Sequence, residues 1–97
     1  MNIQKTLSGA ALTVALEGRL DTTTAPKLEE LRGSVDGVSR LVFDLAKLEY
    51  ISSAGLRVLL AMQKRMNRQG AMLLRNVNEA VMEVFEVTGF SDILRIE

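Results

Sequence analysis

Residues 41–56 read LVFDLAKLEYISSAGL and contain a change from one structural pattern to another. The compact apolar run at 41–45, bounded by charged residues, predicts a buried central strand. Residues 53–69 contain no Pro and a single Gly, Gly55, which predicts a long helix that ends at Gly70. The two serines of the segment therefore stand at the start of the predicted helix.

The predicted helix over residues 53–69 has one broad apolar side and one basic side. The basic side carries Arg57, Lys64, Arg65 and Arg68. Residues 51–75 hold five positive charges and no acid, whereas residues 76–97 hold five acids and one Arg. Such a run is usually a solvated helix face, and the alternative is a docking face for an acidic partner. The sequence leaves both interpretations open.

The remaining segments predict an α/β domain with a mixed sheet. Two N-terminal strands, at 3–7 and 11–16, form a hairpin around Ser8-Gly9. The later elements are a helix with Leu28, Leu31 and Val35 on one face, a strand at 71–75, a helix capped by Asn78 and closed by Gly89, and a strand at 93–96. The predicted order is β-β-α-β-α-β-α-β, which gives a four- to five-stranded mixed sheet with packed helices in one domain over residues 1–97.

The composition excludes several classes of protein. The chain has 97 residues, 47% apolar and 25% charged, which is ordinary for a globular domain. It has no Cys and no His, so disulfides, zinc thiolates, cysteine nucleophiles, imidazole acid–base catalysis and Ser-His-Asp triads are excluded. It also has no G-x-x-x-x-G-K-[ST] phosphate loop. We therefore predict no enzyme activity, no metal site and no cofactor, and we leave open nucleotide binding without hydrolysis.

The charge and hydropathy patterns also limit the partners and the location. The 12 Lys and Arg balance the 12 Asp and Glu, unlike the basic excess of a general nucleic-acid binder, so we expect no direct nucleic-acid contact. The apolar runs fall far short of the roughly 20 residues that a membrane span needs. The N-terminus contains no apolar signal region. We expect a cytoplasmic protein without a membrane span.

Three segments together resemble one protein family. The central segment carries, in order, Asp44, Tyr50-Ile51, Ser52-Ser53 and Ala54-Gly55-Leu56. The other two are Gly18-Arg19-Leu20-Asp21 and residues 84–90, VFEVTGF. In order and spacing the chain resembles STAS domains over nearly its whole length, and in particular the bacterial anti-sigma factor antagonists. It differs by having Ser52 where the best-known antagonists carry Asp, and by stopping where many relatives continue into a C-terminal helix.

The resemblance implies a phosphorylatable Ser, and two serines are available. Family alignment favours Ser53, while Ser52 or both residues remain alternatives. Judged from the residues alone, a Ser at a helix start is most often an N-cap. The resemblance makes Asp21 the acidic neighbour of the phosphoacceptor, and otherwise it is a turn or N-cap residue. Asp44 is expected to be structural and to accept backbone N–H bonds from the segment that follows it.

The resemblance also implies a surface that binds a partner protein. Its residues are Asp21, Thr22, Ser52, Ala54, Gly55, Leu56 and Arg57. Gly55 is expected to leave the start of the helix bare, so that another protein's active site can reach the hydroxyl. Leu56 has two interpretations, either the first core anchor of the helix or an apolar contact for the partner.

The implied function is that of a regulatory binding module in transcription control. By resemblance, the unphosphorylated chain binds an anti-sigma factor that is also a serine kinase, and so releases the sigma factor. Phosphorylation at Ser53 would switch binding off, and a serine phosphatase would restore it. The alternatives are a STAS subunit of another partner-switching, secretion-control or transport assembly, and a structural subunit in which Ser53 only caps the helix.

Overall fold

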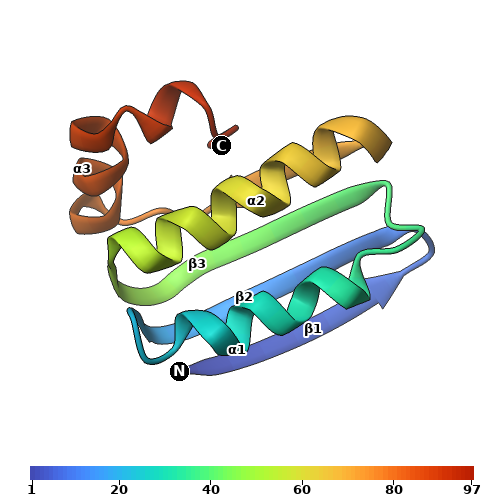
Figure 1. Ribbon diagram of the computed structural model, residues 1–97, viewed down its shortest axis with the longest axis horizontal. Coiled ribbons are helices and arrows are strands. Elements are labelled where there is room, and N and C mark those ends of the chain that lie inside the picture. The colour runs from blue at the N-terminus through green and yellow to red at the C-terminus, as the bar shows by residue number, and fades with distance from the viewer.

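Four strands form one mixed sheet in the order β1-β2-β3-β4 in the computed structural model, which describes residues 1–97 (Figure 1). The strands are β1 (Asn2–Ser8), β2 (Ala11–Leu20), β3 (Arg40–Ile51) and β4 (Ala71–Arg75). β1 is antiparallel to β2, as predicted for a hairpin, and β2, β3 and β4 run parallel. Gly9 lies in the hairpin turn with a φ of 61°, a conformation that glycine adopts without steric cost.

A helix follows each of the strands β2, β3 and β4. They are α1 (Ala25–Glu29), which continues as a 3-10 turn over Glu30–Ser34, α2 (Ser53–Gln69) and α3 (Glu79–Thr88). α1 and α2 lie over the same face of the sheet and contact each other, whereas α3 lies to one side and packs against β3 (Figure 1). α2 is the longest helix at 17 residues, and neither it nor the shorter helices could span a lipid bilayer.

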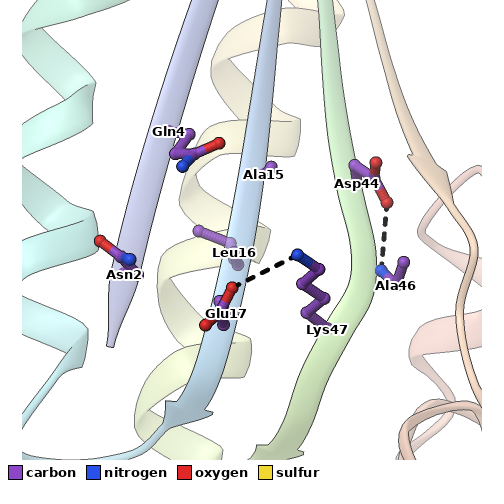
Figure 2. A pocket seen from close by; sticks show the side chains of 8 residues that line it. All are labelled: Asn2, Gln4, Ala15, Leu16, Glu17, Asp44, Ala46 and Lys47. Carbon is purple, nitrogen blue, oxygen red and sulfur yellow. Dashed lines mark hydrogen bonds and ion pairs between the residues drawn. The ribbon is translucent and has the colours of Figure 1, made fainter.

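The core lies between the sheet and its helical layer. Alternate side chains of β2 are buried, namely Leu12, Val14 and Leu16. Phe43 at the centre of β3 has no exposed surface. Three methionines fill gaps in the same core, as expected for flexible side chains; they are Met62, Met66 and Met72. The opposite face of the sheet carries no helix over β1 to β3, and Figure 2 shows that face with α2 behind it.

β3 is much longer than the strand predicted at 41–45. It has 12 residues and reaches Ile51, so residues 47–51, which follow the predicted strand, also pair with β2. Asp44 therefore lies well inside the strand, and β2 continues through Gly18 to Leu20, beyond the strand predicted at 11–16. Two register shifts, next to Ala15 and next to Gly18, each accommodate one extra residue of β3. These bulges break the period-2 pattern by which a strand is recognised in a sequence.

Two other predicted elements are shorter than expected. The first helix gives way to a 3-10 turn at Glu30, and Gly33 inside that turn disfavours a longer α-helix. The strand predicted at 93–96 is reduced to one parallel bridge between Leu74 and Ile96. The sheet therefore has four strands, and the observed order is β-β-α-β-α-β-α.

Candidate functional site

The carboxyl ends of β2 and β3 lie side by side at one edge of the sheet. Leu20 pairs with Ile51, and the N–H of Ser52 donates to the carbonyl of Leu20 at 2.9 Å. The turn after β2 and the start of α2 therefore adjoin (Figure 1). Ligands of α/β proteins commonly bind at the carboxyl ends of parallel strands. The predicted site residues all fall on two segments here, 21–22 and 52–57, which we call the carboxyl-edge site.

Neither serine at the start of α2 caps the helix. Ser52 stands at the N-cap position, and its carbonyl accepts the N–H of Leu56 at 3.0 Å. The Ser52 hydroxyl, however, is buried and has no hydrogen-bond partner. Ser53 is the first helical residue, is exposed, and has no hydrogen bond to its hydroxyl. The first-turn N–H groups of α2 thus have no side-chain cap, and the two serines differ in a way that the sequence did not reveal.

Gly55 faces the sheet and not the solvent. A Cβ at this position would lie 2.6 Å from Cγ of Leu20 and 3.1 Å from Cγ1 of Ile51. Glycine therefore allows α2 to sit close to the ends of β2 and β3. The interpretation of Gly55 as a bare surface for another protein was wrong, because the residue is buried.

The rest of the first turn divides into inward and outward side chains. Leu56 is 5% exposed and belongs to the hydrophobic core, so the structure favours its interpretation as the core anchor of α2. Ala54 is half-buried against the same core. Ser53 and Arg57 are exposed. A partner that approaches the first turn of α2 therefore meets a hydroxyl and a guanidinium first.

Asp21 organises the turn that follows β2. Its Oδ1 accepts hydrogen bonds from the hydroxyl of Thr23 at 2.7 Å, from the N–H of Thr23 at 3.0 Å and from the N–H of Thr24 at 3.2 Å. In return, the N–H of Asp21 donates to the hydroxyl of Thr24 at 2.8 Å. The hydrogen bond from the Thr23 hydroxyl is the main cause that holds the pKa of Asp21 below its usual value. The site thus includes a fixed, ionised carboxylate, with the exposed Thr22 next to it.

Asp44 has the structural role predicted for it. Its Oδ1 accepts the N–H of Ala46 at 3.1 Å and the side-chain amide of Asn76 at 3.0 Å. Asn76 has a φ of 58°, in the left-handed region that Asn tolerates better than most residues. The hydrogen bond from Asn76 is the main cause of the lowered pKa of Asp44. This Asp44–Asn76 clasp joins the bulged part of β3 to the end of β4.

Three basic side chains of α2 are exposed and form no ion pair. They are Arg57, Lys64 and Arg68, which we call the α2 basic stripe. Their helical spacing places them on the same side of α2 as Ser53. Arg65, predicted on the same face, instead pairs with Asp36. The free positive charge of α2 is therefore smaller than the sequence indicated, and it runs along the helix from the carboxyl-edge site.

Tyr50 and Arg19 form an exposed pair that was not among the predicted site residues. Tyr50 is 40% exposed, and the Arg19 guanidinium lies over its ring, 4.3 Å from the centroid. The two residues are partners in the ladder between β2 and β3. Tyr50 and Ile51 are adjacent in the segment that resembles the family. Neighbouring strand residues point to opposite faces, so Ile51 is buried and Tyr50 is not.

A hollow of about 230 Å³ lies on the face of the sheet that carries no helix (Figure 2). Side chains of β1, β2 and β3 line it, and an ion pair between Glu17 and Lys47, 3.7 Å long, joins β2 to β3 there. Neither serine contributes to its walls. The carboxyl-edge site is therefore a surface separate from this hollow. No group of three acidic side chains is placed to hold a metal ion at either location.

The sequence and fold of the chain match known proteins. A family model described as "Mlab, STAS domain" matches residues 3–95. BtrV of Bordetella bronchiseptica, named as a candidate anti-sigma factor antagonist, is 43% identical over 88 residues, which cover 88% of this chain and 76% of BtrV. The chain is a STAS domain of the anti-sigma factor antagonist family.

Two further members of the family extend the comparison. The anti-sigma-B factor antagonist of Staphylococcus aureus is 28% identical, over 99% of this chain and 92% of its own length. The solved structure of an anti-sigma factor antagonist from Mycobacterium paratuberculosis shares the fold with a TM-score of 0.88 at 25% identity, over 98% of this chain and 83% of that one. Anti-sigma factor antagonists are non-enzymatic regulators, in agreement with the prediction that this STAS domain is not an enzyme.

Proposed function

We propose that this STAS domain is a partner-switching protein that is controlled by phosphorylation at Ser53. The unphosphorylated form binds an anti-sigma factor with serine kinase activity and so frees a sigma factor. The kinase phosphorylates Ser53 and the complex weakens, and a serine phosphatase restores binding. The family and the exposed first turn of α2 support this proposal. A kinase that uses ATP would meet the chain in the cytoplasm.

One observation carries the choice of Ser53. Its hydroxyl is exposed and free of hydrogen bonds at the first position of α2, whereas the hydroxyl of Ser52 is buried. A kinase must bring the acceptor oxygen within bonding distance of a phosphate, so an exposed hydroxyl is the better substrate. The uncapped N–H groups of the first turn can donate hydrogen bonds to the resulting phosphate, and the helix dipole also favours an anion there.

The surroundings of Ser53 indicate how a phosphate would act. Arg57 lies four residues further along the helix and can approach a phosphate on Ser53. The ionised carboxylate of Asp21 opposes that phosphate by repulsion. With these opposing contributions, we expect the isolated domain to keep its fold. The modification adds about −1.5 to −2 charges at the contact surface, where a partner must exclude water, so it should block binding locally.

The test uses each anti-sigma factor serine kinase of the source bacterium, purified and supplied with Mg-ATP. Mass spectrometry should locate phosphate on Ser53 in the wild type and in Ser52→Ala, and none in Ser53→Ala. Ser53→Ala should still bind the kinase, and Ser53→Asp should bind at least tenfold more weakly. Phosphate on Ser52, or phosphorylation of Ser53→Ala, would overturn the assignment.

One observation favours a second function. The matched family model is described as "Mlab, STAS domain" and not as an antagonist, so a STAS subunit of another partner-switching, secretion-control or transport assembly is the second candidate. Such a chain would release no sigma factor from any kinase of the source bacterium. A competition experiment with a labelled sigma factor distinguishes the two, because only an antagonist displaces it from the anti-sigma factor.

A further inference from the structure

The stacked pair of Tyr50 and Arg19 lies next to Ser53. Tyr50 precedes Ser53 by three residues, so their Cα atoms are at most about 11 Å apart. Arg19 lies opposite Tyr50 on the neighbouring strand, about 5 Å away across the ladder. The side chains of both are substantially exposed, 40% for Tyr50 and 60% for Arg19. An aromatic ring and a guanidinium are thus exposed together at the same carboxyl edge of the sheet as the proposed phosphorylation site.

The fold does not account for this pair. The core contacts of this part of β3 come from Leu48 and Ile51, which are 1% and 2% exposed. Arg19 has one ionic neighbour, Asp21, at 3.9 Å, and a long exposed ion pair contributes little to stability. That long ion pair uses Oδ2 of Asp21, whereas Oδ1 accepts the hydrogen bonds of its own turn. The guanidinium is therefore held over the Tyr50 ring, with its N–H groups available to an incoming acceptor.

A protein interface centred on Ser53 is large enough to include this pair. A standard interface buries about 800 Å² on each partner, which corresponds to a disc of about 16 Å radius. By the chain and ladder spacings above, the Cα atoms of Tyr50 and Arg19 both lie within about that radius of Ser53. Tyr and Arg are the residue types that most often dominate interface energies, especially where their side chains are held in place before binding.

We propose that Tyr50 and Arg19 form the anchor by which this domain binds its kinase partner. This inference rests on the proposed function and names the chemistry of the partner. The kinase presents an apolar side chain that packs on the exposed part of the Tyr50 ring and a carboxylate that pairs with the Arg19 guanidinium. Arg57 is exposed, forms no ion pair and adds positive charge four residues after Ser53, so the complementary surface of the kinase is acidic.

The experiment measures the Kd between the purified anti-sigma factor serine kinase and variants of this domain. All variants also carry Ser53→Ala, so that the kinase does not phosphorylate them during the measurement. We expect Tyr50→Ala to raise Kd at least tenfold and Arg19→Lys at least fivefold, because Lys lacks the planar fork. Tyr50→Phe keeps the ring and should change Kd less than threefold. Leu7→Ala is the control, since Leu7 is 64% exposed and lies in β1 opposite Leu12, near the end of β2 that is remote from Arg19, and it should leave Kd unchanged.

The outcomes separate this inference from the proposed function. If the Ser53→Ala protein binds no kinase, the proposed function fails and this inference fails with it. If the Ser53→Ala protein binds the kinase, and the added Tyr50→Ala and Arg19→Lys each leave that Kd unchanged, the inference alone is wrong. Arg19→Lys alters only an exposed side chain and carries the test if Tyr50→Ala unfolds. In a double-mutant cycle the effects of Tyr50→Ala and Arg19→Ala should be non-additive, because each removes the support of the other, and additive effects would contradict the stacked anchor.

Discussion

The helices α2 and α3 begin in contrasting ways, although each has a residue that commonly caps helices at its N-cap position. At α3, Oδ1 of Asn78 accepts the N–H of Val81 at 2.9 Å, and its amide donates to the carbonyl of Leu48 at 2.7 Å. At α2, the hydroxyl of Ser52 bonds to nothing. α3 also has an acidic residue in its first turn, Glu79, whereas α2 has none. The start of α3 is therefore satisfied internally, and the start of α2 is left positive and unpaired.

This difference separates polar groups that build the fold from polar groups that are available to a partner. The Asp44–Asn76 clasp belongs to the first kind, because both side chains are bonded within the domain. The exposed hydroxyl of Ser53 belongs to the second kind. Four substitution experiments can break or sharpen this comparison.

The largest effect should come from the capped helix. Asn78→Ala removes the cap of α3 and the bond to Leu48, so we expect a loss of about 2 kcal/mol in the free energy of unfolding. Ser52→Ala removes a hydroxyl that has no partner and should change this free energy by less than about 0.5 kcal/mol. Urea unfolding of both variants provides the comparison. A loss at Ser52→Ala as large as that at Asn78→Ala would show that Ser52 does cap α2.

A smaller loss is expected at Gly55. Gly55→Ala would place a Cβ against Leu20, and such overpacking costs about 1–3 kcal/mol, partly offset by about 1 kcal/mol of better helix propensity. Gly33→Ala is the matched control, because no atom lies within 4 Å of its added Cβ, and it should be neutral or slightly stabilising. Thermal unfolding measures both. Equal stability of the two variants would mean that α2 does not need glycine to pack on the sheet.

The clasp should be visible in the pH dependence of stability. Its hydrogen bonds lower the folded-state pKa of Asp44 below the unfolded value, about 3.9. The resulting stabilisation is present above the unfolded pKa and is lost as the pH falls through the folded pKa. Asn76→Ala removes the main cause of the shift, so its free energy of unfolding should vary less with pH in this acidic range than that of the wild type. An unchanged pH profile would contradict the role of the clasp.

The smallest effects should follow the α2 basic stripe. At a rise of 1.5 Å per residue, Arg57, Lys64 and Arg68 lie about 6, 17 and 23 Å along the helix from Ser53. Reversal to Glu should therefore slow kinase association about threefold at Arg57, less at Lys64 and least at Arg68, and the differences should shrink as salt is added. Stopped-flow association rates at low and high salt provide the measurement. If all three variants associate as fast as the wild type at low salt, the stripe is ordinary solvated surface.

The sequence predicted the parts of the fold that depend on local pattern. The helix predicted at 53–69 agrees with α2, because its apolar spacing and the following Gly70 are local signals. The extension of β3 to Ile51 was not predicted, because it depends on two bulges opposite β2. The strand predicted at 93–96 has the composition of a strand, but a single bridge forms there and Leu94 packs into the core.

The same limit applies to the carboxyl-edge site. The segment Ser52-Ser53 was found from its sequence, but which hydroxyl is exposed depends on how α2 packs against the sheet. Gly55 was singled out from the sequence as a bare helix start, but the structure shows that it lets α2 approach Leu20, which is a tertiary contact. Tyr50 and Arg19 are 31 positions apart in the sequence, and only the register of β2 with β3 brings them together.

The most direct test of the account compares backbone amide chemical shifts of the domain before and after phosphorylation of Ser53. The start of α2 is open, so a phosphate there should act locally. We expect shift changes confined to the Asp21 turn and the first turns of α2, with β4 and the capped start of α3 unchanged. Changes that spread through residues 71–75 and 79–88 would mean a conformational switch and would contradict the local account.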